Sequence, residues 1–373
     1  MSRPEAKALA VAVAGLVVVA TAAILFRRMR KKSPSKGAGI PGRVENVVWS
    51  GTLRDIPSDK VTLVVDAAYL LAEGLVWCHR TGVLWWVDIE GRRICRMKES
   101  PVGKLEAVSW DVPVRPGSLA LRNNATLPLL VAFEDAFSFY NPETCERVPV
   151  EEGGGEYVQV PESRLNDGRC DRVGRFVCGA INLRNIDMPL DVWEARVGAY
   201  RVEPRGGGQG GSVVRGILPD LMFRCYNGTC FSPKGDIMYC TDSPTRQVLS
   251  FDYDSTSGTI SNRVVLFELK EGEGVADGAT TDADGCLWVA VFGAGEVRRY
   301  SSQGRLLKTI PLPLANKATC VTIGGPDLDI LFICTACVGL SDVERLEQTN
   351  AGGIFAIRLD KGCVGLPEPI FNG

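Results

Sequence analysis

The sequence of 373 residues predicts an all-β protein, a six-bladed β-propeller, preceded by an N-terminal transmembrane helix. Two observations predict the propeller. Short β-branched or aromatic runs recur with one cadence from residue 60 on, and 41 glycines with 21 prolines suit many tight turns. One uncharged apolar run predicts the helix. The chain thus divides into an anchor with its linker, residues 1–42, and a propeller, residues 43–373.

The anchor is the apolar run Leu9–Phe26, whose 18 residues are near the lower limit for a membrane-spanning helix. Five Lys and Arg residues stand among the six positions that follow it, 27–32. A cleavable signal peptide carries its positive charge before the apolar run, so this order favours a retained anchor. The positive-inside rule then predicts a single-pass membrane protein whose propeller faces the cytosol, in a membrane that the sequence leaves open.

The cysteines and the single histidine restrict the chemistry. The 13 cysteines are an odd number scattered singly, which favours a reducing compartment and buried thiols over disulfides. Cys334 and Cys337 form a C-x-x-C pair, but no second pair completes a zinc site, so they are expected in the core. His79 lies in a polar turn, which argues against a Ser-His-Asp or Cys-His nucleophile system.

Charge is distributed unevenly along the chain. Residues 1–40 hold eight of the 42 basic residues and one of the 44 acidic ones, so the propeller carries 34 basic and 43 acidic residues. An acidic body argues against nucleic acid as a partner and is compatible with cation binding. We expect a monomeric propeller.

Six copies of a strand–turn–strand pattern begin near residues 73, 116, 166, 227, 277 and 318. Their spacing, roughly 40 to 60 residues, is that of four-stranded propeller blades. The run Val61–Val65 precedes the first full copy. It is expected to supply the outer strand of the last blade and so to close the ring without a free edge.

A carboxylate or carboxamide stands directly before glycine in several copies, at Glu73-Gly74, Asn227-Gly228 and Asp277-Gly278, and in the stretch Ser163–Gly168. Oxygen side chains at a repeated position of a cyclic fold converge on one point, where a hard divalent cation binds. Each such dipeptide alone is also an ordinary turn former. Three other acids are not expected to bind a metal: Asp88 and Asp242 are interpreted as blade-packing acids or caps, and Asp167 as a structural residue that bonds the backbone.

The chain resembles the senescence marker protein/gluconolactonase/luciferin-regenerating-enzyme-like family, and most closely its regucalcin-like members. The resemblance covers about residues 60–360, and its motifs follow the family order. They are Ala72–Trp77, Trp86–Asp88, Arg164–Gly168, Asn227-Gly228, Thr241–Ser243, Asp277-Gly278 and Leu287–Ala290. Leu75 departs from the family, which has proline after Glu-Gly.

The resemblance implies a divalent-metal-dependent hydrolase that opens sugar lactones, with one cation, Ca²⁺, Zn²⁺, Mn²⁺ or Mg²⁺, near the propeller axis. It implies that Glu73, Asn227 and Asp277 bind the metal and that Asp277 is also the general base. Arg164 and Asn166 are implied to face the substrate. This assignment is chemically consistent, because a metal acidifies bound water and an arginine stabilises a developing oxyanion.

Two alternatives remain at the level of sequence. The propeller is a calcium- or metal-binding regulatory protein without turnover, or the same site hydrolyses other cyclic esters or phosphotriesters. Relatives also carry a substrate-facing acid after the position of Ala180. Here that acid is Asp187, Asp191 or Glu194, and the sequence leaves the choice open.

Overall fold

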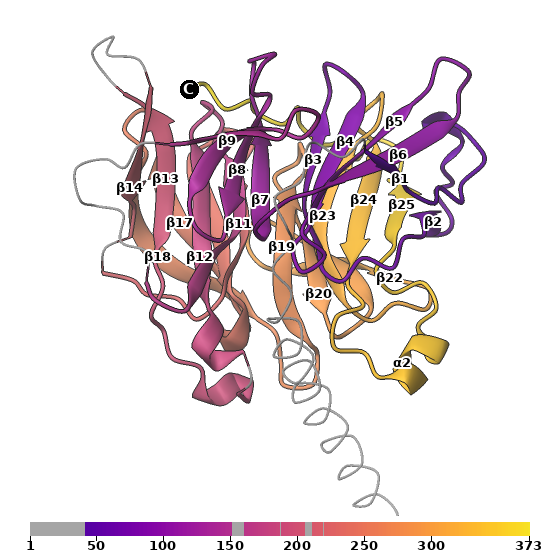
Figure 1. Cartoon of the computed structure of the whole chain (residues 1–373). Coiled ribbons are helices and arrows are strands. Elements are labelled where there is room, and N and C mark those ends of the chain that lie inside the picture. The colour runs from indigo at the N-terminus through magenta and orange to yellow at the C-terminus, as the bar shows by residue number, and fades with distance from the viewer. Residues whose placement is uncertain (1–41, 151–159, 187, 206–210, 219) are drawn as a thin grey trace, which may run out of the picture.

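The computed structural model describes residues 42–150, 160–186, 188–205, 211–218 and 220–373. They form six antiparallel sheets arranged radially around one axis (Figure 1). The innermost strands contact one another in a closed ring, β3–β7–β11–β15–β19–β23 and back to β3. The predicted six-bladed all-β propeller is confirmed.

Each blade is a sheet of four strands, with a fifth on the first blade. Blade 1 contains β3 (Ala72–Cys78), β4 (Val83–Asp88), β5 (Arg93–Glu99), β6 (Leu105–Asp111) and β1 (Arg43–Val44). Blade 2 contains β7 (Pro116–Leu121), β8 (Leu129–Phe133), β9 (Phe137–Asn141) and β10 (Glu146–Pro149). Blade 3 contains β11 (Ser163–Cys170), β12 (Phe176–Asn182), β13 (Ala199–Pro204) and β14 (Ser212–Gly216).

Blade 4 contains β15 (Tyr226–Phe231), β16 (Ile237–Asp242), β17 (Gln247–Asp254) and β18 (Thr259–Glu268). Blade 5 contains β19 (Val275–Thr281), β20 (Leu287–Phe292), β21 (Glu296–Tyr300) and β22 (Leu306–Pro311). Blade 6 contains β23 (Ala318–Gly324), β24 (Ile330–Thr335), β25 (Ile354–Arg358) and β2 (Thr62–Val65). The short helices are η1 (Leu53–Asp55), η2 (Leu183–Asn185), η3 (Leu190–Val192), η4 (Ser243–Thr245) and α2 (Asp342–Glu347).

The ring closes through β2, which pairs antiparallel with β25 and places Thr62 opposite Ala356. This confirms that the run before the first full repeat completes the last blade. The fifth strand of blade 1 was not predicted, because β1 is only two residues long.

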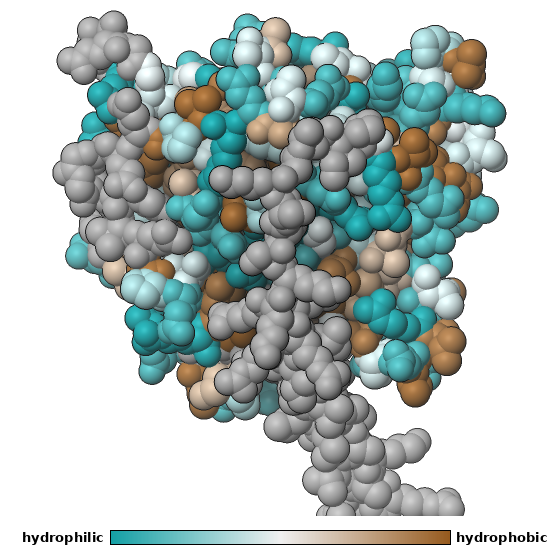
Figure 2. Space-filling model, viewed as in Figure 1, coloured by the Kyte–Doolittle hydropathy of each residue, from teal (hydrophilic) through white to brown (hydrophobic). Residues whose placement is uncertain are grey.

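The expected anchor, Leu9–Phe26, lies outside the described residues. Within the ranges that the structure describes, none of the helices is both long and apolar enough to span a bilayer. On the side shown in Figure 2, hydrophilic residues predominate and apolar ones are scattered among them. Several of the exposed apolar side chains belong to the loops that carry η3 and α2, among them Met188, Val343 and Leu346.

The core lies between adjacent blades, where apolar side chains of neighbouring sheets interdigitate. Trp86 and Trp288 are among the largest fully buried side chains. All 13 cysteines are free thiols. Eleven are buried, as predicted, while Cys145 is exposed and Cys286 is partly exposed.

Two acids that the sequence assigned to packing do bond the backbone. Asp88 accepts hydrogen bonds from the amides of Leu71 and Gly91, at 2.9 and 3.1 Å. Asp242 accepts from the amides of Arg224 and Cys225, at 3.0 and 3.1 Å. Each carboxylate therefore fixes the segment leading into an innermost strand.

Lys317 gives the propeller a pH-dependent stability. Its side chain is 4% exposed, and its ammonium donates to the Val338 carbonyl at 2.7 Å. Burial lowers the pKa of Lys317 from 10.5 to about 8. Between pH 8 and 10.5 the unfolded chain thus holds one proton more than the folded one, so this group stabilises the fold as pH rises.

We expect Lys317→Met to be more stable than wild type at pH 7, by about 2 kcal/mol, because methionine fills a similar volume without a buried charge. The advantage should shrink as pH rises from 8 to 10.5. Urea unfolding of both proteins at pH 7, 9 and 10 measures the difference between their free energies of unfolding. Groups that titrate alike in both proteins do not contribute to this difference. A difference that does not change with pH would contradict the prediction.

Candidate functional site

Every innermost strand carries a register shift where it pairs with the next strand of its blade. On β3, for example, Glu73 lies opposite Val87 and Val76 lies opposite Trp85, so one extra residue stands on the inner strand. A β-bulge twists the strand and re-aims the side chains beside it. The bulges of blades 1, 3, 4 and 5 lie at Glu73, Asn166, Asn227 and Asp277, near the start of the innermost strands.

The repeated dipeptides do not occupy one register position. Glu73 and Asn227 are the last paired residues before the shift, and each precedes a glycine with positive φ, 61° at Gly74 and 65° at Gly228. Asp277 lies one residue later, inside the shift, and so does Asn166. The sequence pattern is therefore offset by one residue between blades, and the bulges accommodate the offset.

A line of hydrogen bonds connects blades 3, 4 and 5. Arg164 donates from its guanidinium to Asn166 Oδ1 at 2.6 Å, and Asn166 Nδ2 donates to Asn227 Oδ1 at 2.7 Å. Asn227 Nδ2 donates to Ser243 Oγ at 2.9 Å, and Ser243 Oγ donates to the Ala276 carbonyl at 2.7 Å. The structure thus brings Arg164, Asn166 and Asn227 into one buried cluster beside Asp277.

This line fixes the orientation of the Asn227 amide. Because the Ser243 hydroxyl gives its one proton to Ala276, it can only accept from Asn227. The amide nitrogen of Asn227 must then point to Ser243, and its oxygen points toward Asn166. A carbonyl oxygen has two lone pairs, and Asn166 uses one of them.

Glu73 and Asp277 complete the cluster with two buried carboxylates, 6% and 8% exposed. Burial raises the pKa of both groups well above the usual range. The charge of Glu73 raises the pKa of Asp277 further, while the Arg164 guanidinium lowers both pKa values. A bound cation would offset the repulsion between these two carboxylates.

Asp167 has a structural contact, in accord with the sequence prediction. Its carboxylate accepts a hydrogen bond from the Thr229 amide at 2.7 Å, which ties blade 3 to blade 4. Burial raises the pKa of Asp167, and the Thr229 amide opposes that rise.

The donor set fits a hard divalent cation. Glu73 and Asp277 provide carboxylate oxygens, and Asn227 provides an oriented amide oxygen, the ligand types that Ca²⁺, Mg²⁺ and Mn²⁺ prefer. No group of three or more His, Cys, Asp or Glu side chains suited to a metal occurs in the described part of the chain. The candidate centre is therefore one in which an amide replaces the third acid.

Two residues near this centre escaped the sequence prediction. Glu90, in the β4–β5 turn, receives a hydrogen bond from Arg115 at 3.3 Å, and Arg115 also pairs with Glu134. Glu90 and Arg164 affect each other's pKa: burial raises that of Glu90 and lowers that of Arg164, and each group opposes the shift of the other. Arg164 Nε is buried without a hydrogen-bond partner among the described residues.

Glu90 was not among the three acids that the sequence offered for the substrate-facing position. Asp187 lies outside the described residues, and Asp191 and Glu194 are exposed on the β12–β13 loop. The Glu90 side chain, by contrast, is 7% exposed. In the sequence, Glu90 is distinguished only by its place in a turn. Its contact with Arg115 joins two blades, so the local sequence does not reveal it.

Comparison with known proteins identifies relatives along most of the chain. Regucalcin of Xenopus laevis is 32% identical over 323 residues, which cover 85% of this chain and 99% of that protein. L-arabinolactonase of Azospirillum brasilense is 31% identical over 305 residues, which cover 80% of this chain and 92% of that one.

Solved structures share the fold. A calcium-binding protein, regucalcin, from Agrobacterium tumefaciens superimposes with a TM-score of 0.72 at 23% identity, covering 85% of this chain and 99% of that chain. A gluconolactonase from Xanthomonas campestris gives 0.60 at 19% identity, covering 88% and 99%. The family model described as the SMP-30/gluconolactonase/LRE-like region matches residues 71–337. With the propeller and this match, the chain belongs to the SMP-30/gluconolactonase/LRE-like family.

Proposed function

We propose that the protein is a divalent-metal-dependent hydrolase that opens sugar lactones. The observation that carries the proposal is the buried line Arg164–Asn166–Asn227 beside the carboxylates of Glu73 and Asp277. A pure cation site has no need of an arginine hydrogen-bonded through Asn166 to one of its ligands, whereas a site for a polar substrate does. The named activities of the arabinolactonase and gluconolactonase relatives support the same reaction class.

Glu73, Asn227 and Asp277 would hold the cation, which, when bound, polarises the lactone carbonyl and acidifies water. Asp277 accepts a proton from the attacking water while the oxygen of that water bonds to the carbonyl carbon of the lactone. The ring C–O bond then breaks, and the same proton passes to the leaving ring oxygen, giving an open hydroxy acid. Arg164 donates hydrogen bonds to the oxygen that becomes negative. Asn166 positions Arg164 and Asn227 relative to each other.

The proposal is tested with the full-length protein, a panel of aldonolactones and pH-stat detection of the acid product. Protein treated with a chelator is assayed alone and with saturating Ca²⁺, Mn²⁺, Zn²⁺ or Mg²⁺. We expect turnover that depends on one or more of these ions. The absence of hydrolysis with every lactone and every ion would refute the proposal.

A second candidate function is calcium binding without turnover. It is favoured by the name of the Agrobacterium neighbour, a calcium-binding protein, and by the all-oxygen donor set. Tight Ca²⁺ binding in calorimetry, with no hydrolysis of lactones, other cyclic esters or phosphotriesters, would support it over the hydrolase.

Glu90 is expected to recognise the hydroxyl groups of the substrate. A carboxylate accepts hydrogen bonds from sugar hydroxyls. Removing that carboxylate therefore weakens the reaction of substrates that carry hydroxyl groups and leaves substrates without them largely unaffected. Glu90→Gln should therefore lower kcat/KM about tenfold for a hydroxylated lactone and less than about twofold for the unsubstituted lactone of the same ring size.

A matched control is Asp135→Asn. Asp135 lies in the β8–β9 turn, and its half-exposed carboxylate pairs with Arg147. This variant should treat both lactones as wild type does. An equal loss for both lactones in Glu90→Gln would contradict a role in hydroxyl recognition.

We further propose that Leu9–Phe26 anchors the propeller to a membrane on its cytosolic side. The order of apolar and basic residues supports this topology. Protease added to sealed cells should leave the propeller intact and digest it after permeabilisation. Digestion in sealed cells would contradict the orientation.

A further inference from the structure

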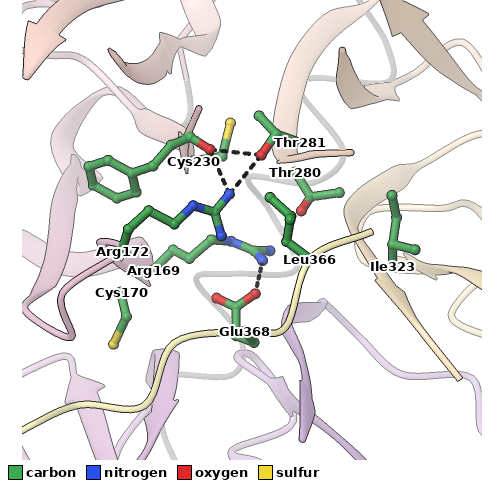
Figure 3. A pocket seen from close by; sticks show the side chains of 10 residues that line it. Arg169, Cys170, Arg172, Cys230, Thr280, Thr281, Ile323, Leu366 and Glu368 are labelled. Atoms are coloured by element: carbon green, nitrogen blue, oxygen red, sulfur yellow. Dashed lines mark hydrogen bonds and ion pairs between the residues drawn. The ribbon is translucent and has the colours of Figure 1, made fainter. Parts of the chain in front are cut away.

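A second polar cluster lies at the opposite end of the innermost strands from the metal-site residues. The latter stand in the first half of the innermost strands, whereas Cys170, Phe231 and Thr281 end β11, β15 and β19. The C-terminal segment, residues 366–370, passes here (Figure 3). It continues to blades 2 and 3, where the Phe371 and Asn372 amides donate to the carbonyls of Leu121 and Gly174.

Two arginines, Arg169 and Arg172, converge at this end of the innermost strands (Figure 3). Arg169 is 8% exposed and pairs with Glu368 of the C-terminal segment at 2.7 Å. Its guanidinium also donates to the Val321 carbonyl at 3.3 Å. The one carboxylate of the cluster is therefore already neutralised by Arg169.

Arg172 has no carboxylate partner of its own among the described residues. Its Nε donates to the Ser232 carbonyl at 3.0 Å, and its Nη2 donates to the Phe231 carbonyl at 2.8 Å and to Thr281 Oγ1 at 3.0 Å. These acceptors are neutral and fix the guanidinium plane. Burial lowers the pKa of Arg172, and the Glu368 carboxylate, which pairs with Arg169 and also lines the cavity described below, opposes that shift. Asp171, its chain neighbour, is fully buried and bonds instead to Arg175 and Tyr253, both at 2.6 Å.

A cavity of about 280 Å³ opens onto this guanidinium. It lies between the β3–β4 turn, which contributes His79 and Arg80, the side chain of Pro233, and the segment 366–370. An inner cavity of about 10 Å³ adjoins it beside Arg169 and Thr280, and has room for no more than a water molecule. The outer cavity has the size of a small metabolite and a lining of net positive charge.

We propose that this outer cavity is a binding site for a small oxyanion, a molecule with one phosphate or carboxylate group, held by Arg172 and Arg80. Nε and Nη2 of Arg172 are occupied, so the two N–H groups of Nη1 are the ones held in a fixed position that can donate to such a group. Arg80 lines the cavity from the exposed β3–β4 turn. The site is separate from the metal-site residues and does not depend on lactone hydrolysis.

The experiment is calorimetric titration of the full-length protein with inorganic phosphate and, separately, with acetate and gluconate. We expect saturable binding of one equivalent. Preference for phosphate or for a carboxylate identifies the source of the anion. Arg172→Gln should weaken binding at least about twentyfold, since a charge-assisted bond is lost. Arg80→Gln should weaken it about fivefold, as for an exposed contact.

If the Arg172→Gln protein does not fold, Arg80→Gln still tests the site, because Arg80 lies on an exposed turn and its replacement does not disturb the core. Arg305→Gln is the matched control. Arg305 is an exposed arginine of the β21–β22 turn, outside the cavity lining. The Arg305→Gln protein should bind the anion as tightly as wild type does. Absence of binding to all three anions, or equal weakening in Arg305→Gln and Arg80→Gln, would overturn the proposal.

Discussion

Replacement of Asp277 by asparagine is expected to lower kcat/KM for a sugar lactone by about 10³-fold, because the variant loses both a metal ligand and the proton acceptor. The same variant should raise the Tm of the chelator-treated protein. In wild type, Glu73 and Asp167 oppose the ionisation of Asp277 inside a buried cluster. Asparagine keeps the shape of the side chain and removes that repulsion.

The opposite signs of these two effects make the result specific. A general loss of folding would lower activity and Tm together, whereas relief of repulsion raises Tm only in the absence of metal. Thermal unfolding with chelator and with added divalent ion measures the second effect. Asp284→Asn, on the exposed β19–β20 turn, should change neither property. An Asp277→Asn enzyme with more than a tenth of wild-type activity would contradict its assigned role.

Replacement of Asp282 by alanine is expected to destabilise the propeller by about 3–5 kcal/mol, the cost of removing one partner of a buried ion pair. Asp282 is fully buried. One carboxylate oxygen accepts from Trp288 Nε1 at 3.0 Å and from Arg299 at 2.6 Å. The other accepts from the Cys286 amide at 2.9 Å, inside the turn between β19 and β20.

The alanine variant leaves these donors buried without an acceptor, and Arg299 without its counter-charge. Denaturant unfolding followed by tryptophan fluorescence measures the loss. Asp282→Asn keeps some of the hydrogen bonds and should fall between alanine and wild type. Asp284→Ala removes the exposed partner of the same arginine and should cost less than about 1 kcal/mol. A loss below about 1 kcal/mol for Asp282→Ala would show that Arg299 and Trp288 find other partners.

The propeller could be predicted because its signals are local. Each blade repeats its own turns and apolar runs, so six similar stretches at similar spacing specify six similar sheets. The closing strand could be predicted too, because a ring must satisfy the outer edge of its last blade. The packing roles of Asp88 and Asp242 followed from their place at strand ends.

The site was predicted only in part, because its geometry depends on contacts between blades. The one-residue offset between Glu73 and Asp277 cannot be seen in the dipeptides and arises from the register of each strand pair. Glu90 and Arg115 come from different blades, and nothing in their local sequence connects them. Arg172 likewise stands in an ordinary turn, and only the course of the C-terminal segment gives it a cavity.

The pairing of β2 with β25 also determines when the protein can finish folding. Thr62 leaves the ribosome long before Ala356, its partner, is synthesised. During that interval blades 1 to 5 can assemble in order, while β2 remains unpaired. In the folded protein two residues of β2 are half-buried and two are buried. Ring closure is thus the last and most non-local step of folding. Slow pairing of this kind leaves an unpaired strand edge exposed, which is prone to aggregation. Molecular chaperones that shield such edges would act on this protein chiefly before its final blade is complete.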